Sequence, residues 1–468
     1  MEIAIFGAGV AGLMAAISLR KQGHRCRLYE RMRRGQETGM GFILMPEGID
    51  CMQGFGVVLA GDHGGVPLHR YYCRNAAGQI LYEQPLPGGS RSYRRRDLIA
   101  ALLLALPSDG GPFFDAELAG LDFDRAGNVT EARLNTGETV KADLYISSEG
   151  IRSQAREALF PGWPAPQAKV LEIVGLVRCV STVRWGNNNL NKFHATNGGI
   201  AFGIMAVDAE HVVWYIQFDA ERFPPPPDDM ENLAPARAAF VKGLVEDWAA
   251  PVPHLLGITN FSRTHLWCPL ETDLVPTFYR GNLVLIGDAA HPLSPFTSQG
   301  VSSAVSDAVA LADSLRTGPD MEQALARYSR ERREQCAPYV ARGRELTQHF
   351  LSPQIGSTVL LPMAKSNGAE PGSFSDNIVR LDLLRERAFN LRWAQQPADV
   401  IPLTAADPDF PISPTIQEQL VRHVRDGVLS YGPAEGLPEF REAVANWMHD
   451  TRNMDCNSEE VFATDSAA

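Results

Sequence analysis

The stretch IAIFGAGVAGLMAAISLRKQGHRCRLYE, residues 3–30, decides the fold. An apolar strand at 3–6 runs into a Gly-x-Gly-x-x-Gly turn made by Gly7, Gly9 and Gly12. A helix is predicted over 13–21, and a second strand over 26–29 ends in an acid. Strand, glycine turn, helix, strand and acid in this order are typical of a dinucleotide-binding βαβ unit.

Each part of this unit has a physical task. The first glycine permits the tight turn, the second lets the backbone approach a pyrophosphate, and the third lets the helix pack on the strand. The pyrophosphate is expected at the positive helix N-terminus, and the acid is expected to accept hydrogen bonds from a ribose hydroxyl. The fingerprint alone does not distinguish NAD from FAD. The candidate cofactor contacts here are Gly7, Gly9, Val10, Ala11, Gly12, Glu30 and Arg31.

A second motif follows the apolar run at 283–286. The sequence GNLVLIGDAAHP at 281–292 reads as a buried strand that delivers an acid to a loop, and SPFTSQG at 294–300 continues that loop. A long helix is predicted from Val301 to about Leu315, with Asp307 inside it. We interpret His291 as a buried histidine that holds the turn.

This second motif resembles the FAD motif of the para-hydroxybenzoate hydroxylase-like, or group A, flavoprotein monooxygenases. The resemblance implies that Asp288 contacts the ribityl and pyrophosphate region of FAD, that Pro295 lies beside the isoalloxazine, and that residues 299–302 face the flavin N1/O2 edge. A helix N-terminus favours the anionic reduced flavin at that edge. Ser298 replaces the usual Gly of the family, and Ser302 the usual Asn. The implied contacts are Gly287, Asp288, Pro295, Gln299, Gly300, Val301 and Ser302.

Three further segments carry the resemblance. Residues 143–156 are similar to the family stretch that serves both FAD and NAD(P)H, with Ser147, Ser148 and Glu149 in place of Gly, Ala and Asp. The segment 95–98 resembles the family Arg-x-x-Leu helix start, and Gly39-Met40-Gly41 falls where the family has a glycine-rich segment near the flavin. The contacts implied by these segments are Gly41, Arg95, Glu149 and Gly150.

The resemblance covers about residues 1–350. It implies an α/β fold: a Rossmann-like FAD/NAD(P)-binding domain with an inserted mixed β-sheet substrate domain. We predict FAD-domain segments at 1–70, 95–164 and 276–350, where a charged helix over 320–348 closes the domain. Substrate-domain segments are predicted at 71–94 and 165–275, a linker at 351–375, and a separate segment at 376–468.

The substrate domain is expected to contain strands over 170–183, 199–207 and 211–218. Residues 201–205 and 213–217 read as an antiparallel pair joined by a turn at 208–210. Phe202, Trp214 and Gln217 are either pocket residues or core, since alternate strand residues are often buried. No substrate-activating base is assigned. The catalytic candidates are Pro295, His194, His211 and Tyr215, with a structural role as the alternative for the last three.

Beyond the linker the sequence changes character. The segment IPLTAADPDFP at 401–411, Tyr431 and the run 437–443 resemble the N-terminal part of fold-type I PLP enzymes, the class I/II aminotransferases and cystathionine β-lyase-like proteins. Residues 459–464 match the strand that opens their large domain. PLP chemistry needs a lysine for the Schiff base, and no lysine follows Lys365. We therefore expect no PLP in this chain and an incomplete, helical aminotransferase-like fragment.

Composition excludes several function classes. The net charge of −12 over 468 residues argues against nucleic-acid and anionic-membrane binding. The seven cysteines are scattered singly, which indicates reduced thiols, a cytoplasmic location and no zinc site. No apolar run reaches the length of a membrane span.

Taken together, these features predict an FAD-dependent monooxygenase. The resemblance implies bound FAD, NADPH or NADH as co-substrate, molecular oxygen, and hydroxylation of an aromatic or heteroaromatic small molecule through a flavin C4a-hydroperoxide. The PLP-like segment suggests an amino-acid-derived substrate and either a homodimer or a partner PLP enzyme. The alternatives are an FAD oxidase or dehydrogenase of an amine or alcohol, a flavoprotein partner module of a PLP enzyme, and a decayed pseudoenzyme.

Overall fold

The computed structural model describes residues 1–35, 40–59, 64–107, 110–163, 168–181, 188–269, 272–353, 420, 433, 435–452 and 454–463. The chain divides into two units, Met1–Ser366 and Asn367–Ala468, which are described separately. Gly39, the segments 376–393 and 401–411, and Tyr431 lie outside the described residues, and the interpretations placed on them stay predictions.

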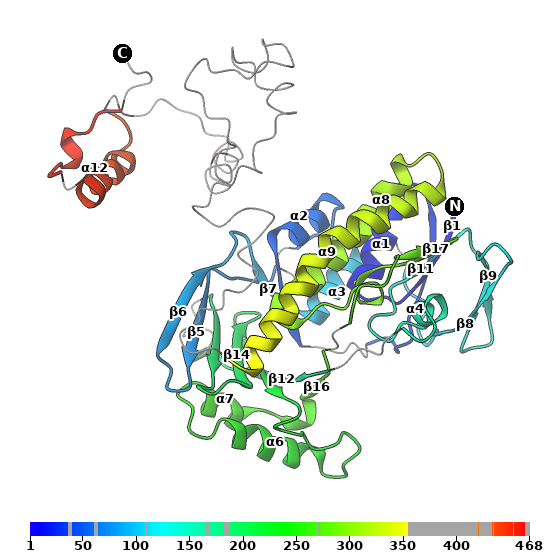
Figure 1. Cartoon of the computed structure of the whole chain (residues 1–468), viewed down its shortest axis with the longest axis horizontal. Coiled ribbons are helices and arrows are strands. Elements are labelled where there is room, and N and C mark those ends of the chain that lie inside the picture. The colour runs from blue at the N-terminus through cyan, green and yellow to red at the C-terminus, as the bar shows by residue number, and fades with distance from the viewer. Residues whose placement is uncertain are drawn as a thin grey trace. The chain divides into compact units, whose positions relative to one another are not determined.

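The first unit is built on a five-stranded sheet of order β17-β18-β11-β1-β2 (Figure 1). Its strands are β1 (Glu2–Phe6), β2 (Arg25–Tyr29), β11 (Leu144–Ser147), β17 (Tyr279–Arg280) and β18 (Leu283–Leu285). All neighbours are parallel except β17 and β18. Parallel strands put their carboxyl ends at one edge of a sheet, so the residues after β1, β2, β11 and β18 gather there.

Two helices pack together beside this sheet. Helix α1 (Val10–Lys21) contacts α8 (Gly300–Thr317), where Ser18 Oγ donates to the Ala308 carbonyl at 3.4 Å and Gln22 Nε2 to the Ala312 carbonyl at 3.0 Å. The helix expected at 13–21 begins three residues earlier, because the Leu13 N–H already bonds to the Gly9 carbonyl. The glycine turn thus leads directly into the helix.

Shorter elements complete this part of the unit. The helices are α2 (Pro46–Gly54), α3 (Arg95–Leu104) and α4 (Gln154–Leu159). One three-stranded sheet contains β3 (Gly41–Leu44), β7 (Arg91–Arg94) and β4 (Val66–Pro67). Another contains β10 (Thr139–Val140), β9 (Val129–Leu134) and β8 (Leu118–Phe123).

A seven-stranded mixed sheet forms the remainder, in the order β16-β12-β15-β14-β13-β5-β6. Its strands are β16 (His265–Trp267), β12 (Val170–Arg178), β15 (His211–Asp219), β14 (Ile200–Ala206), β13 (Leu190–His194), β5 (Arg70–Asn75) and β6 (Ile80–Pro85). The pair β13–β5 is parallel and the other pairs are antiparallel. The predicted β14–β15 hairpin is confirmed, with Phe202 opposite Ile216.

Strand β12 is shorter than expected. It ends at Arg178 rather than at 183, because its partner β15 begins at His211, directly opposite. The Cys179 N–H then bonds to the Glu210 carbonyl in the turn, which closes the ladder.

One face of this sheet is covered by α6 (Leu233–Leu244) and α7 (Val252–Ile258) (Figure 1). Phe202 and Trp214 stack at 5.4 Å inside that core, and Trp214 Nε1 donates to Thr259 at 2.9 Å. The pocket role considered for these two aromatics is therefore wrong. Strand alternation sends Gln217 to the opposite face.

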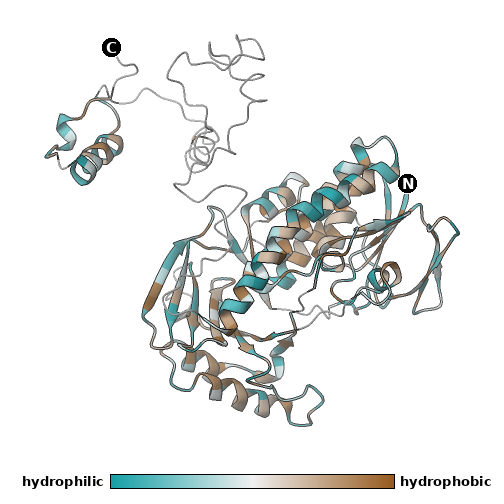
Figure 2. Ribbon diagram, in the orientation of Figure 1, coloured by the Kyte–Doolittle hydropathy of each residue, from teal (hydrophilic) through white to brown (hydrophobic). Residues whose placement is uncertain are grey.

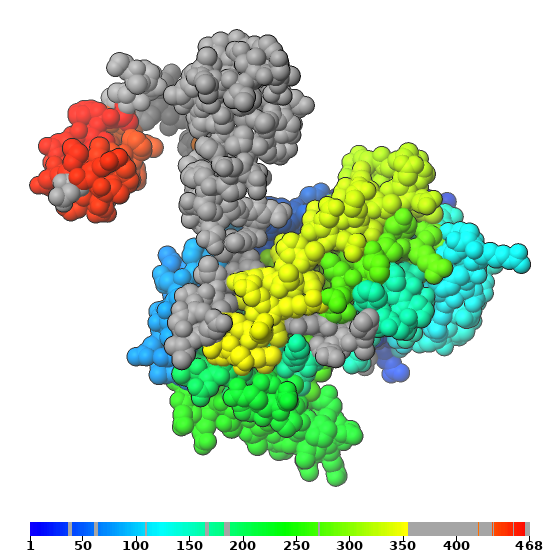
Figure 3. All heavy atoms as spheres, in the orientation of Figure 1, coloured from blue at the N-terminus to red at the C-terminus, as the bar shows by residue number. Residues whose placement is uncertain are grey.

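Helix α9 (Met321–Leu351) is the charged helix predicted at 320–348. Asp320 caps it by accepting from the Gln323 N–H, and Tyr328 Oη donates to the Leu285 carbonyl of β18. Hydrophilic and hydrophobic bands alternate along the helix (Figure 2), as expected for one buried and one solvated side. In Figure 3 the helix (yellow) lies as a band across the visible face of its unit.

The second unit is described over two short elements, α12 (Pro438–Arg452) and a 3₁₀ turn at Ser458–Glu460. Arg441 Nε donates to the Val461 carbonyl at 2.8 Å, which holds the segment after the turn against α12. The strand expected at 459–464 is absent from its described residues, 459–463. A capping box between Asn457 and Glu460 forms the 3₁₀ turn there instead. Across the described parts of the chain, no helix combines the length and apolarity needed to cross a membrane.

Candidate active site

The glycine turn is shaped by two close backbone contacts. Gly7 has φ +100°, and a Cβ there would lie 2.2 Å from the Ser148 carbonyl oxygen. A Cβ on Gly12 would lie 1.9 Å from the Gly7 carbonyl oxygen. At Gly9 the nearest atom is a guanidinium nitrogen of Arg95 at 3.9 Å, so this position is open toward that side chain.

The acid after β2 lies beside this turn. Glu30 accepts hydrogen bonds from the N–H groups of Ala8, at 2.7 Å, and Met32, at 2.9 Å. These bonds fix the carboxylate next to the N-terminus of α1, where a ribose is expected. Arg31 instead points to Glu117, 4.0 Å away, and both side chains are about half exposed.

Asp288 lies in a recess at the carboxyl edge of the sheet. After β18, the Ile286 N–H bonds to the Ser147 carbonyl, and the chain turns through η3 (Gly287–Ala289). Asp288 is exposed to solvent, yet the surrounding protein raises the pKa of its carboxyl, against the lowering effect of His291 and Arg95. The protein around this carboxyl therefore disfavours its charged form.

Arg156 holds the backbone of this recess, a role that sequence reasoning did not assign. Its Nη1 donates to the carbonyls of Asp288 at 3.1 Å and Ala289 at 3.2 Å, and Nη2 donates to that of Ile151. The Asp288 loop is thereby tied to α4. The sequence signal for this role was Arg156 itself, the last residue of the 143–156 motif.

A buried ion cluster lies behind the recess. Asp307 Oδ2 accepts from His291 Nε2 and from the Gly287 N–H, both at 2.6 Å, and Oδ1 accepts from Arg332 Nε at 2.6 Å. Burial alone would lower the pKa of His291, but the Asp307 carboxylate raises it well above its ordinary value. Both His291 and Arg332 lower the pKa of Asp307 against the effect of burial. The cluster joins η3, α8 and α9.

His291, Asp307 and Cys336 bring three metal-type ligand atoms within 4.8 Å of one another. The arginine of the cluster occupies that space, since Arg332 Nη2 approaches Cys336 Sγ at 3.7 Å while its Nε holds Asp307. A positive guanidinium among the ligand atoms opposes a cation. We therefore interpret the group as an ion cluster that holds the loop.

Glu149 is directed to helix α4. Its carboxylate accepts hydrogen bonds from the hydroxyls of Ser147 and Ser153 and from the N–H groups of Gln154 and Ala155. Ser147, one of the departures from the family pattern, therefore satisfies the longer Glu149, another departure. Ser148, the third, donates to the Phe6 and Gly7 carbonyls and braces the glycine turn.

The loop after the recess forms η4 (Pro295–Thr297) and then α8. A side chain on Gly300, at the N-terminus of α8, would meet open space. Ser302 Oγ accepts from the Met45 N–H at 3.2 Å, which joins α8 to the start of α2. Gln299 and Val301 flank Gly300, so the segment implied to face the flavin lies at this helix N-terminus.

Ser298 adopts the left-handed conformation, with φ 52° and ψ 23°. An L-residue with a Cβ is disfavoured there by about 1 kcal/mol relative to glycine. We expect Ser298→Gly to raise the free energy of unfolding by about 0.5–1 kcal/mol, measured by urea denaturation of the FAD-loaded protein. An unchanged or lower midpoint would show that the serine is not strained.

The second face of the seven-stranded sheet carries two of the four catalytic candidates, His194 and Tyr215. Tyr215 covers Gly203, where a Cβ would meet its ring at 2.0 Å, and His194 Nε2 lies 3.5 Å from the Tyr71 hydroxyl. Lys192, not singled out in the sequence, lies 4.7 Å from the ring of Phe296, which follows Pro295 in η4. This contact joins the sheet face to the flavin-motif loop.

His211, predicted as a catalytic candidate, and Gly41, predicted as a cofactor contact, lie apart from this contact. His211 is bound through Nδ1 to Asp208 at 2.9 Å, and Asp208 pairs with Arg94 at 2.9 Å, so the histidine belongs to the β14–β15 turn. A Cβ on Gly41 would lie 2.9 Å from the Tyr93 carbonyl oxygen and 3.0 Å from a methyl of Val213. Gly41 therefore permits close packing of β3 against β7 and β15.

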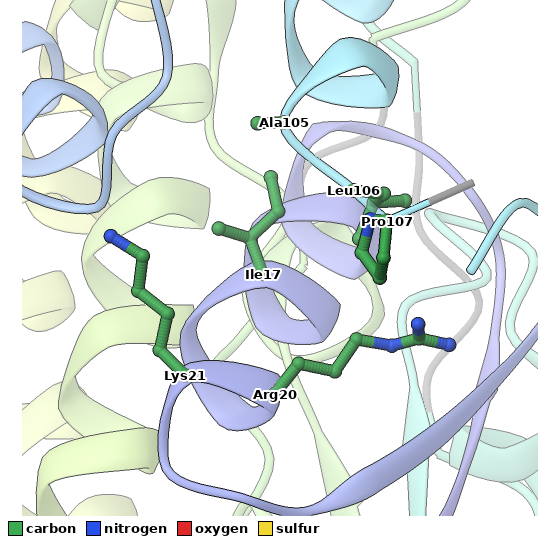
Figure 4. A pocket seen from close by; sticks show the side chains of 6 residues that line it. All are labelled: Ile17, Arg20, Lys21, Ala105, Leu106 and Pro107. Atoms are coloured by element: carbon green, nitrogen blue, oxygen red, sulfur yellow. The ribbon is translucent and has the colours of Figure 1, made fainter. Parts of the chain in front are cut away.

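A shallow hollow of about 230 Å³ lies elsewhere in the unit (Figure 4). It is lined by the C-terminal end of α1 and the chain after α3, with Arg20 and Lys21 at one side and Leu106 and Pro107 at the other. The glycine turn is at the opposite end of α1. The hollow has no acid and no contact with η4, so it is not a candidate for the active site.

The glycine turn, the acid Glu30 and the Asp288 recess together fit FAD. The open backbone at Gly9 leaves room for a pyrophosphate, Glu30 is fixed for a ribose, and the α8 N-terminus is open at Gly300. These features define a dinucleotide-binding flavoprotein. The chain belongs to the family described as FAD binding domain, whose profile matches residues 1–342.

Curated relatives extend this assignment. The chain is 27% identical over 373 residues to FAD-dependent urate hydroxylase of Mycolicibacterium vanbaalenii, covering 76% of this chain and 91% of that protein. It is 26% identical over 361 residues to 6-hydroxynicotinate 3-monooxygenase of Pseudomonas fluorescens, covering 72% and 88%. Kynurenine 3-monooxygenase of Salinispora arenicola is 29% identical over 379 residues, with 71% and 76% covered. The chain is an enzyme of the FAD-dependent monooxygenase type.

Solved structures share the fold. Klebsiella pneumoniae HpxO, complexed with FAD and uric acid, superposes with a TM-score of 0.65 at 22% identity, over 76% of this chain and 90% of that one. Pseudomonas aeruginosa PqsL, in complex with 2-aminobenzoylacetate, gives 0.63 at 21% identity, over 75% and 96%. The fold predicted for residues 1–350 is thus confirmed.

Proposed function

We propose that this enzyme uses NADPH or NADH and molecular oxygen to hydroxylate a small aromatic or heteroaromatic molecule held between η4 and the seven-stranded sheet. The observation that carries the proposal is the approach of Lys192 to Phe296 at 4.7 Å, which brings the sheet face to the loop of the FAD motif. A ring substrate on this face lies next to the position that the resemblance implies for the isoalloxazine.

Different residues of the chain have different roles in this proposed reaction. Glu30 and the glycine turn would hold the ribose and pyrophosphate of FAD, and the N-terminus of α8 would stabilise negative charge on the reduced cofactor. The buried strands and α9 exclude water, which protects the reaction from unproductive side reactions. When bound, FAD supplies the redox and oxygen chemistry, while the protein orients the substrate.

Two finer proposals concern other parts of the chain. The capture of Glu149 by α4 leaves its carboxylate engaged within the protein, so we propose that nicotinamide-cofactor contacts come from other groups of the carboxyl edge, such as Arg95. For residues 376–468 we propose an aminotransferase-like segment, on the sequence motifs at 401–411 and 431–443. A homodimer or a partner PLP enzyme is a further proposal that rests on the same motifs.

Product mass tests the proposed activity. The FAD-loaded enzyme is supplied with NADPH or NADH, ¹⁸O₂ and a panel of aromatic acids and amines. Hydroxylation adds one labelled oxygen atom to the product, whereas an oxidase or dehydrogenase removes two hydrogens and releases no labelled product. Unlabelled, dehydrogenated product would move the assignment to the oxidase. Protein that binds no FAD would indicate a decayed enzyme.

A further inference from the structure

The second face of the seven-stranded sheet has apolar ends and a polar centre. One end packs against β3 and the N-cap of α2 through Ile43, Met45 and Met205. The other end packs against η4 and the end of α9 through Phe296, Leu346 and Phe350. Between these two apolar patches lie the side chains of Glu172, Lys192, Tyr215 and Gln217.

The strand registers bring these polar residues together. Glu172 of β12 lies directly opposite Gln217 of β15, and Tyr215 lies opposite Gly203 of β14, which in turn lies opposite Lys192 of β13. Gln217 Nε2 donates to Glu172 Oε2 at 2.8 Å. Lys192 is 4% exposed, Glu172 is 7% exposed and Gln217 is 2% exposed.

One atom of this group is buried without a hydrogen-bond partner: Gln217 Oε1 accepts no hydrogen bond from the described residues. Lys192 is 4% exposed, and among the described residues its Nζ has no hydrogen-bond partner and no carboxylate within 4.0 Å. Its close contacts are the faces of Phe296, at 4.7 Å, and Tyr215, at 5.9 Å.

The contacts of Lys192 within the protein do not offset the free-energy cost of burying its ammonium group. Burying an ammonium group costs several kcal/mol, whereas a cation–π contact returns about 0.5–2 kcal/mol. An ammonium group and an acceptor without a partner on the same face of the sheet are complementary to a ligand that presents both an acceptor and a donor.

We propose that Lys192 and Gln217 form the subsite that recognises the polar edge of the substrate, an aromatic ring bearing an anionic oxygen beside an N–H donor. Lys192 Nζ donates to the anionic oxygen, and Gln217 Oε1 accepts from the N–H group. Glu172 fixes the amide of Gln217 so that Oε1 faces the ligand. The inference rests on the proposed function, because it places the ring beside the FAD-motif loop at Phe296.

The experiment titrates three probes into the FAD-loaded full-length enzyme and follows the visible absorbance of the flavin. The probe 2-aminobenzoate carries both groups, benzoate carries the anionic group alone, and aniline the donor alone. We expect Lys192→Met to weaken both acids by about 10–100-fold and to leave aniline unchanged, since a hydrogen bond to a charged group is worth about 1.5–3 kcal/mol. Gln217→Met should remove the preference for 2-aminobenzoate over benzoate.

Lys242→Met is the matched control. Lys242 is exposed on α6, which covers the other face of the same sheet, and its loss should change no affinity. Flavin content and melting temperature of each variant show whether it has folded. Unchanged acid affinity in folded Lys192→Met would overturn the proposal, as would a wild-type enzyme that binds neither acid at millimolar concentration.

The pH dependence supplies a second readout. Burial lowers the pKa of Lys192 to about 8, against the charges of Glu172 and Cys73, and raises that of Glu172 to about 7. His194, also facing Lys192, stays neutral because burial lowers its pKa to about 3, and the buried Tyr215 has a raised pKa. Acid affinity should therefore fall between pH 7 and 8, as Glu172 gains and Lys192 loses charge. Lys192→Met should remove the limb near pH 8.

Failure of the subsite and failure of the proposed function give different results. Acid probes that bind through Lys192 without any NAD(P)H-driven incorporation of labelled oxygen would retain the subsite and remove the monooxygenase activity. Labelled product formed equally well by wild type and Lys192→Met, with equal acid affinity, would retain the activity and remove the subsite.

Discussion

Replacing Asp307 by alanine is expected to lower the free energy of unfolding by about 3–5 kcal/mol, the typical cost of breaking a buried ion pair. Asp307 is fully buried and accepts hydrogen bonds from Arg332, His291 and the Gly287 N–H. Its removal leaves a buried guanidinium without its counter-ion and frees the start of the Asp288 loop. Retained FAD should fall together with stability, because Gly287 directly precedes Asp288.

Asp313 provides the control on the same helix. It pairs with Arg316 and Arg327, but its side chain is 50% exposed. Because exposed ion pairs are worth about 0–1 kcal/mol, Asp313→Ala should shift the urea midpoint little. If Asp307→Ala fails to fold, Asp307→Asn keeps one oxygen acceptor and should give a smaller, measurable loss. Equal midpoints for the two alanine variants would refute a stabilising role for the buried cluster.

The local chemistry of the glycine turn was predictable because it depends on short-range sterics. A strand, a Gly-x-Gly-x-x-Gly turn and an acid can be recognised in sequence, and the structure finds β1, α1 and β2 there. The position of Asp288 was predictable for the same reason, because a buried strand followed directly by Gly287 and Asp288 places the acid at the end of that strand. The family resemblance added the flavin, which residue patterns alone did not distinguish from NAD.

The sheet face was less accessible to sequence reasoning. Alternation along β14 and β15 shows that two faces exist, but not which face meets the cofactor-binding part of the unit. That choice depends on long-range packing, in which α6 and α7 take the face of Phe202 and Trp214. Lys192 therefore passed unnoticed, because the strand Leu190–His194 also contains Asn191 and His194, so one more polar residue there gave no distinct signal.

The sequence also did not show that two substituted positions compensate for each other. Ser147 and Glu149 each depart from the family pattern, and the sequence presents them as two separate departures. In the structure the Ser147 hydroxyl donates to the Glu149 carboxylate at 2.7 Å, and both join the N-terminus of α4. Such coupling requires knowledge of side-chain direction, which one sequence does not provide.

Gly12→Ala is expected to abolish tight FAD binding. Alanine normally stabilises a helix relative to glycine by about 1 kcal/mol, so intrinsic propensity alone predicts a more stable protein. Here the added Cβ would lie 1.9 Å from the Gly7 carbonyl oxygen and 2.5 Å from Ser148 Oγ. The Gly7 carbonyl belongs to a turn that Ser148 already holds in place, so it cannot move away from the added methyl group. Relief of the clash must therefore move α1 away from the turn.

This displacement acts on the N–H groups that are to hold the pyrophosphate. We expect at least about a 100-fold loss of FAD affinity, near 2.7 kcal/mol, measured by flavin fluorescence during titration of the apoprotein. Gly243→Ala is the matched control, since Gly243 is in helix α6 with no atom near its added Cβ. That variant should gain stability and keep wild-type affinity. Wild-type FAD affinity in Gly12→Ala would mean that the turn accommodates the methyl group and that close packing of α1 on Gly7 is not what shapes the cofactor site.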